Sequence, residues 1–262
     1  MDFKDQMNNT IRLHEYPRRI VSLVPSQTEL LFDLGLEDEI VGVTQFCIYP
    51  REKVYKRVKI GGPKKFRFEV IDKIQPDLII GNKEENYLKG ILRLQEKYPV
   101  WMSDIVTLED ALLMIRGVGQ LVNRAENANQ IISEIKARMD RLKNYPLMKV
   151  AYFIWKNPYI VAGGDTFITN MLHKCGFINL FSKTSRYPKI TLDQIGETEV
   201  ILLSSEPYPF NHEDVVFFRR NFPNHSVFLV DGTMFSWYGS RLKYAAAYYR
   251  TLREGIKRNG AI

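Results

Sequence analysis

The chain has 262 residues, of which 45% are hydrophobic and 26% are charged. A chain of this length and apolar content can bury one large core or two small ones, so a disordered or fibrous protein is excluded. The formal net charge of +7 bears on association rather than on fold. Because the basic residues are scattered along the sequence, we predict no nucleic-acid binding.

The sequence shows no signal for export, membrane insertion or a disulfide. Residues 1–17 contain no apolar core and no small-residue cleavage site, so we expect no signal peptide in this chain. No apolar run reaches the roughly 18 to 20 residues that a membrane span requires. The two cysteines, Cys47 and Cys175, lie far apart in apolar surroundings, which predicts buried free thiols.

The first third of the chain has the pattern of alternating strands and helices. Residues 20–24 form a short apolar run, and residues 28–36 follow with helical spacing, with Ser26 or Thr28 as the expected N-cap and Gly35 as the stop. Further strands are predicted at residues 40–44, 77–81 and 99–102. This alternation predicts a parallel sheet covered by helices.

The longest helical pattern follows, over residues 124–144, with apolar residues three or four apart and charged residues on the other faces. The strand and helix patterns then restart, with strands at 149–154, 199–203 and 227–231 and helices at 166–174 and 240–257. We therefore predict an α/β protein of two Rossmann-like lobes with parallel sheets, joined by one long interlobe helix. The expected division is 1–122, 123–146 and 147–262.

The two halves also resemble each other. TELLFDLGL at 28–36 matches TFITNMLHKCGF at 166–177, because each is a helix that ends in glycine and an apolar residue. FEVIDKIQPDLIIG at 68–81 matches LDQIGETEVILLS at 192–204, where an acidic residue opens a short helix and another opens a strand. The order is the same in both halves, which favours two similar lobes with a ligand cleft between them.

Motifs of the common enzyme classes are missing. The sequence has no glycine-rich phosphate loop, dinucleotide fingerprint, paired-histidine zinc motif or serine elbow. The four histidines are dispersed, and Asp165 is explained as a residue that starts the helix at 166–174. We predict that the protein is not an enzyme. An enzyme that acts on its ligand through Asp165 or His173 stays open as an alternative.

Aromatic residues gather in the loops expected after the strands. Planar apolar side chains beside arginine suit a large, rigid, partly anionic ligand, and the carboxyl ends of parallel strands are where ligands bind. Core packing is the alternative for any one of them, but as a set they predict a binding cleft. The candidate ligand-binding residues, with two from the helix start at 166, are Phe46, Tyr49, Phe66, Trp155, Asp165, Thr166, Tyr187, Phe235, Trp237, Tyr238 and Arg241.

The segment RIVSLVPSQTELLFDLGLEDEIVGVT, residues 19–44, resembles the opening of a known family. That family comprises the cobalamin-, haem- and ferric-siderophore-binding proteins of ABC importers, called helical-backbone metal receptors. FEVIDKIQPDLII, GGDTFITNMLHKCGFINLF and SRYPKITLDQI continue the similarity in the family's order, over about residues 18–256. The resemblance implies a class III periplasmic-binding-protein-like fold, in which a rigid interlobe helix limits hinge motion.

The resemblance also implies roles for single residues. Glu69 in FEVI and Asp193 in LDQI match two acidic residues, one in each lobe, that dock onto arginines of the membrane permease. Aspartate replaces the more usual glutamate at the second position. Phe46 matches an aromatic position of the cobalamin binders, and residues 235–241 match a loop that contacts the ligand.

We therefore expect the solute-binding component of an ABC importer, which holds its ligand in the interlobe cleft without changing it chemically. Cobalamin is the first candidate ligand, and a ferric siderophore or haem is the second, because Pro63 and Asn82 stand where cobalamin binders can carry tryptophan. No resident cofactor is expected, and the metal is unknown. The expected partners are the small-molecule metal chelate and the permease subunits, through which alone a monomeric protein would meet the membrane.

The resemblance implies a periplasmic location. A cytoplasmic location is the alternative, because no signal peptide is visible in the sequence. The corresponding alternative function is a cytoplasmic corrinoid or metal-chelate carrier without an ABC partner.

Overall fold

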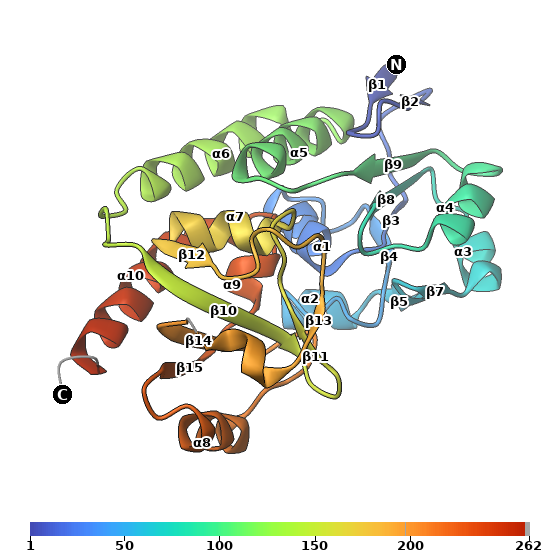
Figure 1. Cartoon of the computed structure of the whole chain (residues 1–262). Helices are drawn as coiled ribbons and strands as arrows, with labels where there is room; N and C mark the ends of the chain where they lie inside the picture. The colour runs from blue at the N-terminus through green and yellow to red at the C-terminus, as the bar shows by residue number, and fades with distance from the viewer. Residues whose placement is uncertain (197, 260–262) are drawn as a thin grey trace. The chain divides into compact units, whose positions relative to one another are not determined.

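The computed structural model describes residues 1–196 and 198–259. Contacts divide the chain into two compact units (Figure 1). Unit 1 comprises Met1–Ile105, Glu109–Ile135 and Tyr238–Arg241, and unit 2 comprises Val106–Leu108, Lys136–Trp237 and the chain from Leu242. The short stretch Tyr238–Arg241 therefore belongs with the N-terminal unit. The division at 1–122, 123–146 and 147–262 stays a prediction.

Within the described residues, no helix combines the length and apolar character needed to cross a bilayer.

Unit 1 is built on a parallel sheet. Its strand order is β5 (Val58–Lys59), β4 (Ile40–Val43), β3 (Ile20–Ser22), β8 (Leu78–Asn82) and β9 (Val100–Ser103), and every pairing is parallel. The three strands β3, β8 and β9 are buried at every residue, as expected where helices cover both faces. The strands predicted at 20–24, 40–44, 77–81 and 99–102 are confirmed.

Helix α1 (Pro25–Asp33) follows β3 directly. Its N-cap is Val24, so the prediction of Ser26 or Thr28 is wrong. The reason is that Pro25 fits the first helical position, where its missing N–H is not needed, while the Thr28 hydroxyl donates to Val24 O at 2.9 Å from inside the helix. The predicted stop at Gly35 is confirmed, because this glycine has φ 81° at the helix end.

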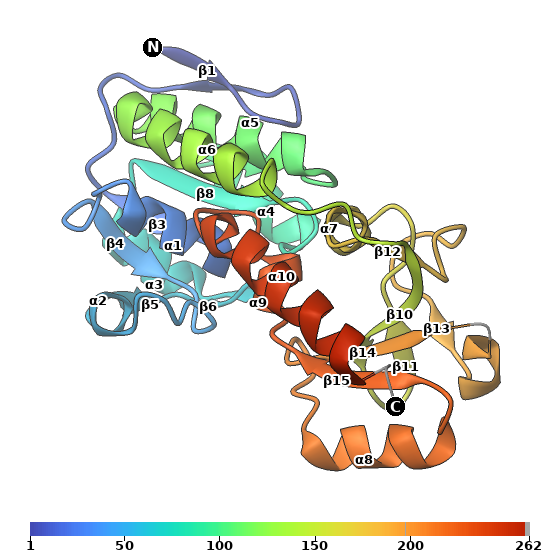
Figure 2. The ribbon, with the colours of Figure 1, turned by 90° about the vertical axis from the view of Figure 1, so that its left-hand side faces the viewer.

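The remaining helices of unit 1 include a closely packed pair. The helices are α2 (Arg51–Tyr55), α3 (Phe68–Ile74), α4 (Leu88–Gln95), α5 (Leu108–Leu121) and α6 (Ala125–Met139). Helices α5 and α6 lie side by side in both views (Figures 1 and 2). A Cβ atom at Gly119 would overlap the Cβ of Ala128, so glycine permits this close approach.

Helix α6 passes from one unit to the other, since its residues up to Ile135 belong to unit 1 and those from Lys136 to unit 2. The helix predicted at 124–144 is present but ends earlier, at Met139. The next turn tightens there, because Leu142 N donates to Met139 O, three residues back. Helix α10 has 18 residues against 15 in α6, so the prediction that α6 is the longest helix is wrong.

An N-terminal hairpin, which the sequence patterns do not predict, flanks strand β9. Its strands are β1 (Asp2–Lys4) and β2 (Thr10–Arg12). The Trp101 indole Nε1 donates to Lys4 O at 3.2 Å, and Gln6 N donates to Met102 O at 3.1 Å. The hairpin thus supplies hydrogen-bond partners to the outer strand of the sheet.

Unit 2 contains a mixed sheet. Its order is β13 (Lys189–Ile190), β11 (Tyr159–Val161), β10 (Met148–Trp155), β14 (Val200–Ser204) and β15 (Ser226–Val230), and β12 (Phe177–Asn179) also pairs with β10. The strands predicted at 149–154, 199–203 and 227–231 are confirmed and pair in parallel. Strand β11 is antiparallel to β10, because the short connection between them cannot make a parallel crossover.

The helices of unit 2 repeat one feature of unit 1. They are α7 (Phe167–Lys174), α8 (His212–Asn221), α9 (Thr233–Ser236) and α10 (Leu242–Asn259), with a 3₁₀ turn, η1, at Leu192–Ile195. Gly176 after α7 has φ 82°, matching Gly35 after α1 at 81°. The repeat predicted from TELLFDLGL and TFITNMLHKCGF therefore corresponds to two helices with the same glycine-based end.

Candidate ligand-binding site

Polar side chains are buried at the carboxyl end of the unit 1 sheet. The Gln27 amide Nε2 donates to Ser103 Oγ at 2.7 Å, and Asn82 Nδ2 donates to the same oxygen at 3.0 Å. The Asn86 Oδ1 atom accepts from Asn82 N at 2.9 Å. Because the network joins α1 to the last residues of β8 and β9 and to the loop after β8, it holds this edge of the sheet in one arrangement.

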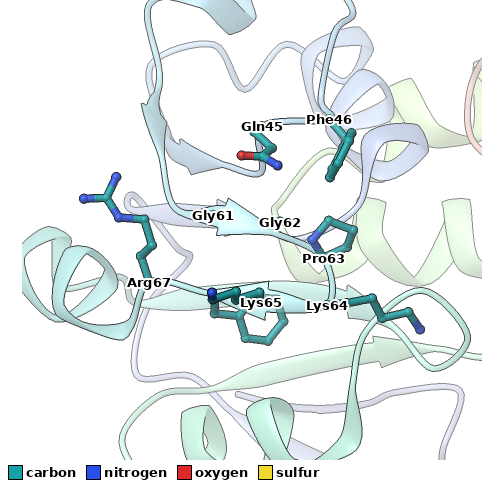
Figure 3. A pocket seen from close by; sticks show the side chains of 9 residues that line it. Gln45, Phe46, Gly61, Gly62, Pro63, Lys64, Lys65 and Arg67 are labelled. Carbon is teal, nitrogen blue, oxygen red and sulfur yellow. The ribbon is translucent and has the colours of Figure 1, made fainter.

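An open hollow of about 520 Å³ lies above the small hairpin formed by β6 (Gly61–Gly62) and β7 (Lys65–Phe66) (Figure 3). Its lining residues follow the carboxyl ends of β4 and β5, where a parallel sheet places its ligands. Asn86 Nδ2 donates to Pro63 O at 3.3 Å, which ties the hairpin turn to the polar network. The residues that line the hollow are Gln45, Phe46, Gly61, Gly62, Pro63, Lys64, Lys65, Phe66 and Arg67.

Two glycines shape this hollow. Gly61 has φ +98°, and a Cβ atom there would overlap Lys65 O, so the turn requires glycine. A Cβ atom at Gly62 would lie 3.3 Å from the Phe46 ring, and Figure 3 shows that ring beside Gly62 and Pro63. The hairpin backbone therefore forms the surface against which Phe46 rests.

The two predicted phenylalanines of unit 1 play different parts. Phe46 is 55% exposed and presents its ring to the hollow. Phe66 is buried, and its ring centroid lies 4.9 Å from that of Tyr87 and 6.1 Å from that of Phe68. Phe66 thus packs the hairpin against Tyr87 and Phe68, and Phe46 supplies an exposed apolar surface on the wall of the hollow.

Three further candidates, Tyr49, Tyr238 and Arg241, make contacts within unit 1. The Tyr238 hydroxyl donates to Glu85 Oε1 at 2.8 Å, and burial beside that carboxylate raises the pKa of Tyr238 well above its usual value. Arg241 pairs with Glu29, and its guanidinium carbon lies 4.2 Å from the Tyr49 ring centroid. These contacts attach the stretch Tyr238–Arg241 to the N-terminal unit.

In unit 2, Asp165 positions a loop. Its carboxylate accepts from Ser185 Oγ at 2.7 Å and from the backbone N–H of Arg186, and these two hydrogen bonds lower the pKa of Asp165. The Arg186 guanidinium lies 5.6 Å from the Tyr187 ring centroid. Thr166 is buried and caps α7 by accepting from Thr169 N. The structure therefore brings Asp165, Thr166 and Tyr187 into one loop region.

The other unit 2 candidates differ in exposure. Trp155, at the end of β10, is 39% exposed, and its ring lies 5.8 Å from that of Tyr208. Phe235 is fully buried against Tyr152 and Tyr249, at 5.3 and 4.9 Å between ring centroids. The buried Trp237 donates its indole N–H to Glu206 Oε1 at 3.0 Å. Their predicted roles in ligand binding stay predictions.

The two predicted docking acids occupy equivalent positions in their own units. Glu69 lies in the first turn of α3 with its side chain 68% exposed, and Arg67 Nε lies 3.5 Å from its carboxylate. Asp193 lies, also exposed, in the first turn of η1. Carboxylates at these positions complement the helix dipole and stay accessible to a partner.

Within the described ranges 1–196 and 198–259, no group of three or more His, Cys, Asp or Glu side chains could hold a metal ion.

Several residues of the site were not predicted from the sequence. The lysines and the arginine that line the hollow follow the sequence GGP, which is typical of a tight turn. This turn pattern is the sequence signal that could have indicated them. Glu29, Glu85 and Glu206 pair with residues far away in the chain, so no local pattern marks them.

Comparisons with known proteins agree with this architecture. A family model described as periplasmic binding protein matches residues 20–218. The vitamin B12-binding protein of Vibrio campbellii is 30% identical over 195 residues, covering 71% of this chain and 70% of that protein.

Solved structures show the same fold. A possible iron-binding periplasmic solute-binding protein of Staphylococcus epidermidis has a TM-score of 0.77 at 23% identity, covering 92% of this chain and 99% of that one. The periplasmic vitamin B12-binding protein of Vibrio cholerae has a TM-score of 0.76 at 19% identity, covering 92% and 98%. With most of its length matched by the family model, the chain belongs to the periplasmic binding protein family.

Proposed function

We propose that this protein is the substrate-binding component of an ABC importer for a metal chelate, with cobalamin first and a ferric siderophore or haem second. The observation that carries the proposal is the open hollow of about 520 Å³ at the carboxyl edge of the unit 1 sheet, with the exposed Phe46 ring on its wall. An exposed aromatic ring beside a hairpin that is hydrogen-bonded to a buried polar network suits the flat apolar part of a corrinoid or porphyrin. The named relatives that bind vitamin B12 support the same ligand class.

We propose reversible binding without catalysis. The Asp165 carboxylate, the alternative catalytic group, accepts hydrogen bonds from Ser185 and Arg186 and so has a role in holding a loop. His173 is exposed on α7. A periplasmic location, a monomeric state and a permease partner complete the proposal, and the placement of the ligand between the lobes stays a prediction from the sequence.

A visible-absorbance titration tests this function. The purified protein is titrated with cyanocobalamin, haemin and a panel of ferric siderophores, and each positive result is checked by calorimetry. We expect saturable binding of one class at one ligand per chain, with the ligand recovered unchanged by mass spectrometry. If no ligand of the panel binds, the proposed function is wrong. If a ligand is recovered chemically modified, the protein is an enzyme, which is the alternative function.

A further inference from the structure

The excess positive charge of the chain is concentrated in two segments of unit 2. Residues 136–149 and 243–257 together contain nine of the 37 basic residues and two of the 30 acidic residues, leaving 28 of each in the rest of the chain. The formal charge of the two segments is therefore +7, which equals the formal charge of the whole chain. Basic residues are scattered along the sequence, but their excess over acidic residues is not.

The two segments lie against each other within unit 2. Arg138 Nη1 donates to Lys243 O at 3.0 Å, and Arg253 Nη2 donates to Pro146 O at 2.6 Å. Figure 1 shows the connection from α6 to β10 beside α10. The surface formed by residues 136–149 and 243–257 is called the basic face below.

Most cations of the basic face are open to solvent. Lys243 is half-buried and Arg253 is buried, and the other seven are exposed. For Lys136, Arg141, Lys143 and Arg250, the described part of the chain includes no side-chain hydrogen bond or ion pair. The exposed seven are Lys136, Arg138, Arg141, Lys143, Lys149, Arg250 and Lys257. Several of these charges therefore have no partner within the described protein and can meet an anionic one.

Acidic side chains on the basic face are few. Asp140 and Glu254 are the two exposed acids within its segments. Glu199 lies at its edge, where its carboxylate accepts from the backbone N–H of Lys149 at 2.7 Å. Three carboxylates among nine basic residues leave the face positively charged.

Large apolar side chains are exposed among these cations. Leu147 is 55% exposed and Tyr244 is 49% exposed, and Lys243 Nζ lies 5.2 Å from the Tyr244 ring centroid. An anionic bilayer attracts lysine and arginine to its headgroups and accepts aromatic and aliphatic side chains at its interface. A nucleic acid would pair with the cations, but it offers no apolar layer to Leu147.

We propose that the basic face binds the surface of an anionic phospholipid bilayer. Its exposed lysines and arginines meet the lipid phosphates, and Leu147 and Tyr244 enter the interface between headgroups and acyl chains. Each such cation contributes about a fivefold gain in affinity near an anionic membrane. This contact is direct and separate from docking onto a permease, and it does not depend on which chelate the protein carries.

Co-sedimentation with lipid vesicles tests the proposal. Vesicles of phosphatidylcholine with about one-third phosphatidylglycerol are compared with vesicles of phosphatidylcholine alone at low ionic strength. We expect the wild type to bind the anionic vesicles at least about tenfold more tightly and to be released by salt. The variant R141Q/K143Q/R250Q/K257Q removes four exposed charges, so its affinity for anionic vesicles should fall about 100-fold or more.

The matched control removes four exposed cations outside the basic face and lowers the net charge by the same amount. It is R51Q/K56Q/R116Q/K189Q, and it should bind anionic vesicles within about threefold of the wild type. Circular dichroism establishes that both variants are folded.

Several results would overturn the proposal. Equal binding of the wild type to the two kinds of vesicle would show that the face does not recognise anionic lipid. Equal losses in the two variants would assign the attraction to net charge rather than to this face. Tighter binding of duplex DNA than of anionic vesicles, in the same buffer, would identify a nucleic acid as the partner instead.

Discussion

Arg241 and Glu29, which are 212 positions apart in the sequence, form a two-point ion pair within unit 1. Arg241 Nε lies 2.8 Å from Glu29 Oε2, and Arg241 Nη2 lies 2.7 Å from Glu29 Oε1. The two side chains are 11% and 13% exposed, so the pair is largely shielded from water. It joins the stretch Tyr238–Arg241 to helix α1.

Breaking this pair should destabilise the fold. E29Q or R241Q removes the opposite charge from beside one shielded charged side chain, so we expect a loss of about 1 to 3 kcal/mol in the free energy of unfolding. The double variant should lose less than the sum of the two single losses, because it removes both charges of the pair. Urea titrations of the four proteins measure this coupling. The control is D2N, which breaks the exposed Arg12–Asp2 pair and should leave the urea midpoint unchanged. Additive single losses would show that the pair contributes nothing.

Removing the Phe46 ring should weaken ligand binding and leave stability unchanged. The ring is 55% exposed, so F46A creates no core cavity and should shift the free energy of unfolding by no more than about 0.5 kcal/mol. Loss of its contact with a flat ligand should reduce affinity about tenfold or more. The control is Y55A, since Tyr55 is 87% exposed and does not line the hollow. Equal affinities of the two variants in the absorbance titration would contradict the role of Phe46.

Gly61 and Gly35 allow backbone strain to be separated from steric overlap. Both have positive φ, but a Cβ atom at Gly61 would overlap Lys65 O, whereas one at Gly35 would meet nothing within 4 Å. G35A should therefore cost about 1 kcal/mol from the left-handed backbone alone. G61A should cost more and should also weaken ligand binding, because the hairpin under the hollow must shift. Urea titration and ligand titration measure the two effects, and equal costs for both variants would contradict the overlap.

The parallel strands could be predicted because burial on both faces gives short, continuous apolar runs, as in residues 20–24 and 77–81. The β6–β7 hairpin could not, because two-residue strands carry no periodicity. The same limit applies to single aromatic residues. Phe46 and Phe235 look alike in the sequence, yet one is 55% exposed and the other is fully buried. Which ring faces a ligand depends on packing with residues that are distant in the chain, such as Tyr152 for Phe235.

The two thiols should be unreactive in the folded protein, and their predicted burial as free cysteines is confirmed. Burial raises the pKa of Cys175 to about 12 and also raises the pKa of Cys47. At pH 8 we therefore expect slow reaction with a disulfide reagent in buffer and fast reaction of both thiols in urea. Fast labelling without urea would contradict this burial.

The same shift makes stability depend on pH. Above the ordinary thiol pKa of 9.0, the unfolded chain loses protons that the folded protein keeps, so the free energy of unfolding falls as the pH rises. C175A removes this contribution for one thiol. Urea midpoints of the wild type and of C175A, measured at pH 8 and pH 10, should show a smaller decline in the variant.

Replacing the two exposed acids should separate transport from binding. Glu69 and Asp193 each lie exposed in the first turn of a short helix, one in each unit, which suits contact with two permease subunits. E69A/D193A should therefore bind the chelate within about twofold of the wild type but support much less uptake through the cognate importer. Because Arg67 lies beside Glu69 and lines the hollow, ligand affinity must be measured on the same variant.

The matched control for this experiment is E52A/E213A, which removes two other exposed first-turn acids, one from α2 and one from α8. Both double variants lose the same charge and the same favourable interaction with helix dipoles, so any general effect on folding or net charge appears in both. Loss of uptake in E69A/D193A alone, with ligand affinity kept, identifies those carboxylates as the contacts with the permease. Full uptake by E69A/D193A would reject that docking role and favour a chelate carrier that works without an ABC partner.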